Sequence, residues 1–181
     1  MTFAGSQLDD RLAAGADAGR SAVSSRLFNR VTWIVECLAL FGLFFAYAGG
    51  PPPDVNEAHY LAKAKHYWDS QWCRGDLFLE SADAHPLFYL TFGWMSLGMS
   101  LTGFAWLGRS IVWIGLAAAW VDLVRGTTSR VPAAAISGAI VLTLWHHGHL
   151  AGEWVVGGLE AKGPAFVLLL IGLGRAVRGD W

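Results

Sequence analysis

Apolar residues gather along this chain in long blocks that polar and proline-containing stretches separate. The first block, 31–48, follows a region with spaced arginines and ends at a run of three prolines. A bilayer core of about 30 Å needs about 20 helical residues, so such a block predicts a membrane-spanning helix. We expect four of these helices, at 31–48, 105–124, 131–145 and 164–173.

The apolar block at 87–107 allows two interpretations. As one straight helix it would cross the membrane and move Arg125 and Arg130 to the outer side. It is interrupted by three glycines and contains several serines and threonines, which makes it a poor span. We prefer a juxtamembrane or re-entrant helix at 87–102 on the outer side. The basic residues near span ends then obey the positive-inside rule, except Arg109, which lies at the outer end of its span.

The order of these blocks defines the expected domains. Arginines ahead of the first span place the N-terminus in the cytoplasm, and residues 1–30 predict a flexible cytoplasmic tail. Residues 31–181 form the transmembrane domain, with a first outer loop at 49–104 and a second at 146–163. The basic region is too long for a signal peptide. We therefore expect an all-α, polytopic integral membrane protein, placed in a bacterial inner membrane.

Composition agrees with this class. Of 181 residues, 54% are apolar and 15% charged, unlike an ordinary soluble domain. The net charge of -1 and the lack of a basic patch exclude nucleic acid as an expected partner and leave membrane lipids. Cys37 lies in a span and Cys73 in a loop, so we expect no disulfide between them. Glu36, inside the first span, should reach the interface or pair with Arg30.

The first outer loop contains the pattern of an amphipathic helix. Four residues recur at helical spacing and share one face: Glu57, Leu61, Ala64 and Trp68. Asp54 or Asn56 can cap this helix, and its aromatic residues suit the headgroup region. We expect it to lie along the outer surface and to end near residues 73–75.

Two polar clusters lie on the outer face in this topology. The first is Asp54 and Glu57, and the second includes Glu160 and Lys162 in the second outer loop. Ionisable residues at that depth are costly unless they have a use, so the clusters predict a shared site at the membrane boundary. Plainer interpretations stay open, because the first cluster can mark a helix start and the second can be an ordinary ion pair.

Histidines in the second loop suggest a different site. His146 and His149 are three residues apart and Glu153 follows four residues later, so a helix would bring them together as ligands of a divalent metal. A metal-dependent membrane enzyme built on these residues is one alternative function. A non-catalytic membrane subunit is another.

Short motifs give the chain a resemblance to a known superfamily. They are Asn56-Glu57-Ala58-His59-Tyr60, His85-Pro86-Leu87-Phe88-Tyr89, Arg109 following Gly103, and Gly158-Leu159-Glu160-Ala161-Lys162-Gly163. In these motifs and in the order of its parts, over residues 31–175, the chain resembles the N-terminal portion of the GT-C superfamily. Members of that superfamily are polytopic glycosyltransferases that use polyprenyl-phosphate-linked sugars. The resemblance implies an acidic motif at the start of the first outer loop and a surface-lying helix after it.

The chain departs from the family pattern at two places. The family's leading aspartate falls on Asn56, which cannot accept a proton, so Asp54 or Glu57 has to fill that role. The chain also ends at Trp181, whereas such enzymes carry further spans. The resemblance therefore implies a truncated product that lacks further transmembrane segments, a deliberately short chain, or one part of a split assembly.

The implied reaction moves a sugar from a polyprenyl-phosphate donor to an acceptor hydroxyl on the outer face. A carboxylate has to take the proton of that hydroxyl, and we expect Asp54 or Glu57 as this base. The departing phosphate needs cations or hydrogen-bond donors. The expected substrate-binding residues are His59, Tyr60, His85, Arg109, Glu160 and Lys162.

Overall fold

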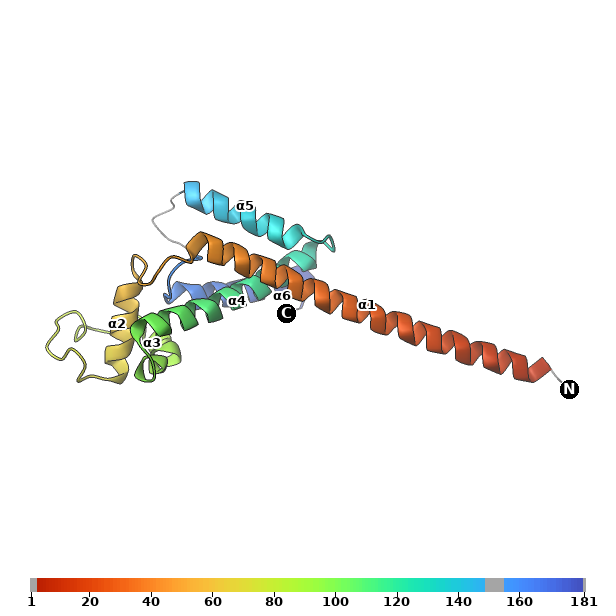
Figure 1. The fold of residues 1–181 in the computed structure, drawn as a ribbon, viewed down its shortest axis with the longest axis horizontal. Coiled ribbons are helices and arrows are strands. Elements are labelled where there is room, and N and C mark those ends of the chain that lie inside the picture. Colours follow the sequence, from red (N-terminus) through yellow and green to blue (C-terminus); the bar gives the residue numbers. More distant parts are fainter. Residues whose placement is uncertain (1–2, 149–154, 181) are drawn as a thin grey trace.

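The computed structural model describes residues 3–148 and 155–180, which fold into helices joined by turns and loops (Figure 1). In chain order these are α1 (Phe3–Ala48), α2 (Glu57–Trp68), α3 (Pro86–Phe92), the 3₁₀ helix η1 (Gly93–Leu97), α4 (Leu101–Thr127), α5 (Ala133–His147) and α6 (Lys162–Arg178). Neither described stretch contains a strand, so the predicted all-α class is confirmed.

Helix α4 is the helix against which the others assemble. Helices α1, α5 and α6 all pack on it, and α6 runs alongside it in Figure 1. The core between them includes Leu40 of α1, and Trp113 and Leu116 of α4, all nearly inaccessible to solvent. Small residues allow close approach, since a Cβ at Gly138 of α5 would lie 2.4 Å from the Leu40 side chain. Close contact through small residues is typical of helices that pack within a membrane.

The ends of these helices form two groups. Helices α2, α3 and η1 lie at one end of the bundle, and the turn between α4 and α5 lies at the other (Figure 1). At this second end, the guanidinium of Arg125 donates a 2.7 Å hydrogen bond to the Glu36 carboxylate. We expected Glu36 to reach the interface or Arg30. Packing of α1 against α4 brings it to Arg125 instead.

Residues 87–107 do not form one straight helix. Helix α3 gives way to η1 at Gly93, a turn follows at 98–100, and α4 begins at Leu101. The Ser100 hydroxyl caps α4 by accepting a hydrogen bond from the Gly103 N–H. The prediction of an interrupted segment is thus confirmed, although α4 begins four residues earlier than the expected span at 105.

The N-terminal region differs from the expected flexible tail. Residues from Phe3 onward are helical and continue without a break into the apolar segment, so that α1 ends at Ala48. The sequence between these limits contains no proline, and its first part is rich in alanine, the strongest helix former. Helix α1 therefore extends well beyond the rest of the bundle (Figure 1).

In the part of the chain that the structure describes, two helices are long and apolar enough to cross a membrane. They are Ser24–Ala48, within α1, and Leu101–Thr127, which is α4. Helix α5 has 15 residues and α6 has 17, so they are about 22 and 26 Å long, less than a bilayer core of about 30 Å. Length and composition thus support two spans and leave the four-span topology a prediction.

Candidate functional site

The two polar segments that were predicted to share a site come together. The Leu159 N–H donates a 2.6 Å hydrogen bond to Oε1 of Glu57, although the two residues are far apart in the sequence. A Cβ at Gly158 would lie 2.9 Å from the Glu57 Cβ and 3.1 Å from the Asp54 Cβ. Only glycine fits there without a shift of this backbone, and the predicted convergence of the two segments is confirmed.

An ion pair between Glu57 and Arg109 lies at the centre of this contact. The guanidinium donates from Nε to Oε1 at 2.8 Å and from Nη2 to Oε2 at 2.5 Å. Its Nη1 donates to the Gly50 carbonyl at 2.7 Å, just after α1. The Asp54 N–H completes the carboxylate's contacts by donating to Oε2 at 2.9 Å. One bidentate pair therefore joins α1, α2, α4 and the segment before α6.

Burial restricts what this pair can do. Glu57 is 0% exposed and Arg109 is 1% exposed. Desolvation alone would raise the pKa of the Glu57 carboxyl, but hydrogen bonds from Arg109, Leu159 and Asp54 and the charge of Arg109 outweigh it and lower the pKa. Both groups as placed hold the fold together and have no free face for a substrate. Of the two predicted bases, Asp54 is the exposed carboxylate.

Other predicted residues line a cavity of about 430 Å³ beside α2. We call it the polar cavity because polar side chains stand in its wall, although apolar groups supply much of its surface. The Tyr60 hydroxyl lies 3.2 Å from Nε2 of His85, and the two rings lie 5.1 Å apart. His59 lies on the same wall, with its ring 5.3 Å from the ring of Phe78. The structure thus brings together His59, Tyr60 and His85 around one space.

A second cavity of about 420 Å³ adjoins the polar one. Its lining is mostly apolar and comes from α3 and the start of α6, including Leu87, Phe88 and Leu168. Ala84 and His85 line both cavities. His85 therefore stands where a polar space meets an apolar one.

The remaining predicted residues of the second loop form an ion pair. Nζ of Lys162 lies 3.1 Å from Oε2 of Glu160, which agrees with the plainer interpretation of these two charges. Lys162 begins α6 between Ala161 and Pro164, both of which line the apolar cavity. Its backbone thus lies at the edge of that cavity, while its ammonium is paired with Glu160.

The alternative metal site falls largely outside the described residues. His149 and Glu153 belong to the stretch between 148 and 155, and His146 is exposed, with its ring 6.1 Å from that of Tyr47. Within 3–148 and 155–180, no three His, Cys, Asp or Glu side chains are grouped so that they could hold a metal ion.

The sequence analysis missed Lys63 as a site residue. It belongs to α2, is 3% exposed, and lines the polar cavity. The helical spacing that puts Glu57, Leu61 and Ala64 on one face of α2 leaves Lys63 off that face. Its burial depends on the loop after α2 folding back over it, and no local pattern predicts that.

We expect Glu57→Gln to lower the free energy of unfolding by about 3–5 kcal/mol, because it leaves the Arg109 charge buried without its partner. Asp54→Asn is the matched control, since Asp54 is exposed and its side-chain oxygen accepts from the Val55 N–H, which an amide oxygen also does. Thermal unfolding of the purified protein in detergent measures both. Equal stability of the two variants would contradict the role assigned to the pair.

The lowered pKa of Glu57 also predicts a pH dependence. A carboxyl whose folded pKa lies below its ordinary value of 4.5 stabilises the fold above that value and loses this contribution as the pH falls through the folded pKa. Wild-type protein should therefore lose more stability between neutral and strongly acidic pH than Glu57→Gln does. Unfolding midpoints across that range test this, and parallel curves for the two proteins would refute it.

No protein-family model, no curated protein and no solved structure matches this chain. The resemblance to the GT-C superfamily accordingly stays a hypothesis carried by its short motifs. The contacts and cavities beside α2 and α3 are the observations that bear on function.

Proposed function

We propose that this chain is a membrane-embedded part of a GT-C-like glycosyltransferase, and that its outer end binds a polyprenyl-phosphate-linked sugar. The observation that carries the proposal is the pair of adjoining cavities, one with several polar side chains in its wall and one almost wholly apolar, with His85 in the wall of both. An amphiphile with a polar head and a long apolar chain suits such a pair. A soluble sugar nucleotide would leave the apolar cavity without a use.

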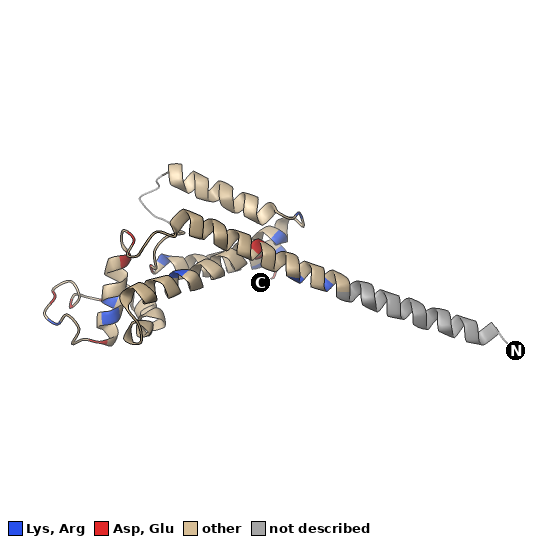
Figure 2. Cartoon of the chain, in the orientation of Figure 1, with Lys and Arg blue, Asp and Glu red and all other residues tan. Residues whose placement is uncertain are grey.

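The surface of the bundle supports membrane insertion. Large apolar side chains are exposed on all four bundle helices: Ile34 and Leu38 of α1, Ile111 and Ile114 of α4, Ile140 and Leu144 of α5, Leu168 and Leu169 of α6. Exposed apolar surface of this extent indicates contact with lipid or with protein. Charged residues gather toward the ends of the bundle in Figure 2. We propose that α1, α4, α5 and α6 all cross, the two short ones with local thinning of the bilayer.

Orientation follows from the basic residues. Arg125 and Arg178 lie at the end of the bundle opposite α2 and α3, where Arg178 donates to the Asp122 carbonyl. The positive-inside rule assigns that end to the cytoplasm. The cavities beside α2 and α3 then open on the outer side, where a polyprenyl-linked sugar would be used.

Asp54 is the carboxylate that this arrangement leaves for proton transfer. It is exposed, adjoins Gly158 of the second outer segment, and precedes Asn56 of the polar cavity by two residues. In the proposed step the acceptor hydroxyl attacks the anomeric carbon and gives its proton to the Asp54 carboxylate, while the bond to the lipid phosphate breaks. His85 and Lys162 stabilise the charge that develops on the departing phosphate.

The proposal predicts that substitution of Asp54 impairs sugar transfer but not lipid binding. Asp54→Asn should lower sugar transfer by about a hundred- to ten-thousand-fold, the usual cost of losing a general base, with little change in affinity for polyprenyl phosphate. Transfer of labelled sugar in membranes and lipid binding by the purified protein measure the two effects.

Asp69→Asn is the control, because this carboxylate lies just past the far end of α2. Near-normal transfer by Asp54→Asn would exclude the assigned base. Wild-type protein that binds the lipid without any transfer would instead indicate a lipid-binding subunit, and no binding of polyprenyl phosphate would refute the proposal.

The proposed orientation predicts where thiols react. Native Cys73 is exposed in the loop after α2, so a membrane-impermeant maleimide should label it in intact cells or spheroplasts. In a Cys73→Ser background, Ser129→Cys in the exposed turn after α4 should react only after the membrane is permeabilised. Labelling of Ser129→Cys from outside would reverse or refute this topology.

A further inference from the structure

Residues 69–85 connect α2 to α3 without a regular helix or strand. This connection supplies Phe78, Ser81 and His85 to the polar cavity. On its other side it borders an open polar cleft of about 580 Å³, and Ser81 lines this cleft as well. The shape of both spaces thus depends on how a segment without regular structure is held.

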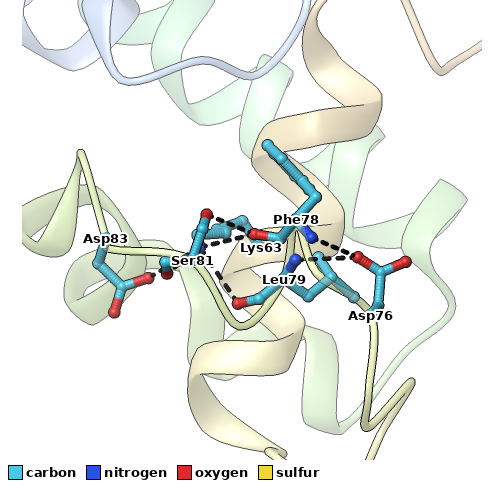
Figure 3. A network of polar contacts seen from close by, with 6 residues as sticks. All are labelled: Lys63, Asp76, Phe78, Leu79, Ser81 and Asp83. Atoms are coloured by element: carbon cyan, nitrogen blue, oxygen red, sulfur yellow. Dashed lines mark hydrogen bonds and ion pairs between the residues drawn. The ribbon is translucent and has the colours of Figure 1, made fainter.

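The buried side chain of Lys63 holds this connection in place. Its ammonium donates to the carbonyls of Phe78 at 3.0 Å, Leu79 at 3.1 Å and Ser81 at 2.5 Å, and to the Ser81 hydroxyl at 3.0 Å (Figure 3). The Asp83 carboxylate lies 3.6 Å away. Five oxygens from a short stretch of chain therefore surround one buried cation.

Asp76 fixes the same stretch by accepting hydrogen bonds from its backbone N–H groups. Its Oδ1 accepts hydrogen bonds from the Phe78 N–H at 2.9 Å and the Leu79 N–H at 3.0 Å (Figure 3). The peptide groups of these two residues are thus held by a carboxylate at their N–H side and by an ammonium at their carbonyl side. The carbonyls gathered by Lys63 repel one another unless a cation lies between them, so the arrangement needs that charge.

We infer that Lys63 is a positioning residue of the polar cavity. The oxygens of residues 78–83 form a cation site that its ammonium fills, and this keeps the wall that leads to His85 in its binding shape. A compact ammonium suits converging carbonyls better than the planar fork of arginine. The inference rests on the proposed function for the identity of the ligand, but not for the organisation of the loop.

Chemical rescue tests the inference. Lys63→Ala removes the ammonium and leaves room for a small cation, so amides of residues 76–83 should exchange hydrogen faster, and affinity for polyprenyl phosphate should fall by roughly ten- to a hundredfold, the scale of a misplaced site. Methylammonium should restore both. Tetramethylammonium, which has no N–H to donate, should restore neither.

Two further variants sharpen this test. Lys63→Met keeps most of the side-chain volume without the charge, so it should show the same loss with no rescue by methylammonium. Lys65→Ala is the matched control, since Lys65 lies two residues further along α2 with its ammonium 4.9 Å from the Trp72 ring. It should leave the exchange of residues 76–83 and the lipid affinity unchanged.

Each outcome separates the inference from the proposed function. If wild-type protein does not bind polyprenyl phosphate but methylammonium restores loop protection in Lys63→Ala, the proposed ligand is wrong and the cation site stands. If the loop of Lys63→Ala loosens while lipid affinity stays at the wild-type level, Lys63 does not position the cavity. Unchanged exchange in Lys63→Ala, or equal rescue by both cations, overturns the cation site itself.

Discussion

The bidentate ion pair between Glu57 and Arg109 is the contact on which the end of the bundle with α2 and α3 depends. It joins the start of α2 to the first third of α4. Each partner also contacts a further segment of the chain: Glu57 accepts from the Leu159 N–H, and Arg109 donates to the Gly50 carbonyl. Two buried charges are costly unless both are fully hydrogen-bonded. Here the geometry meets that condition, so removing either partner should cost far more than the pair itself contributes.

The cavities follow from this contact. Once Glu57 fixes the start of α2, the same turn directs His59 and Tyr60 toward the loop that carries His85. A second buried charge, Lys63, holds that loop in place. The most strongly hydrogen-bonded charges thus serve the architecture. The groups left at the wall of the polar cavity include His59, Tyr60 and His85, and the exposed Asp54 lies two residues before Asn56 of that wall. These weaker groups can exchange partners when a ligand enters.

Sequence patterns predicted the parts of this structure that depend on local periodicity. The apolar blocks, the amphipathic α2 and the interruption near Gly93 all come from spacing within a few turns. Partner choice across the fold was harder. In the predicted topology, Arg109 was the one basic residue near a span end that broke the positive-inside rule. That exception was the only sequence signal that Arg109 pairs with a carboxylate. The burial of Lys63 left no such sign, because five oxygens of a loop without periodicity create it.

The motif around Glu57 favoured a catalytic interpretation because a catalytic carboxylate and a carboxylate in a buried ion pair give the same sequence pattern. An acidic residue just past a span is costly, and both catalysis and a buried ion pair can compensate for that cost. Composition alone does not separate the two. Accessibility does, because a general base has to reach the proton that it removes, whereas Glu57 has no exposed surface and Asp54, three residues earlier, is open. In the function we propose, the acidic pair therefore divides its tasks: Glu57 secures the backbone, and Asp54 faces the acceptor.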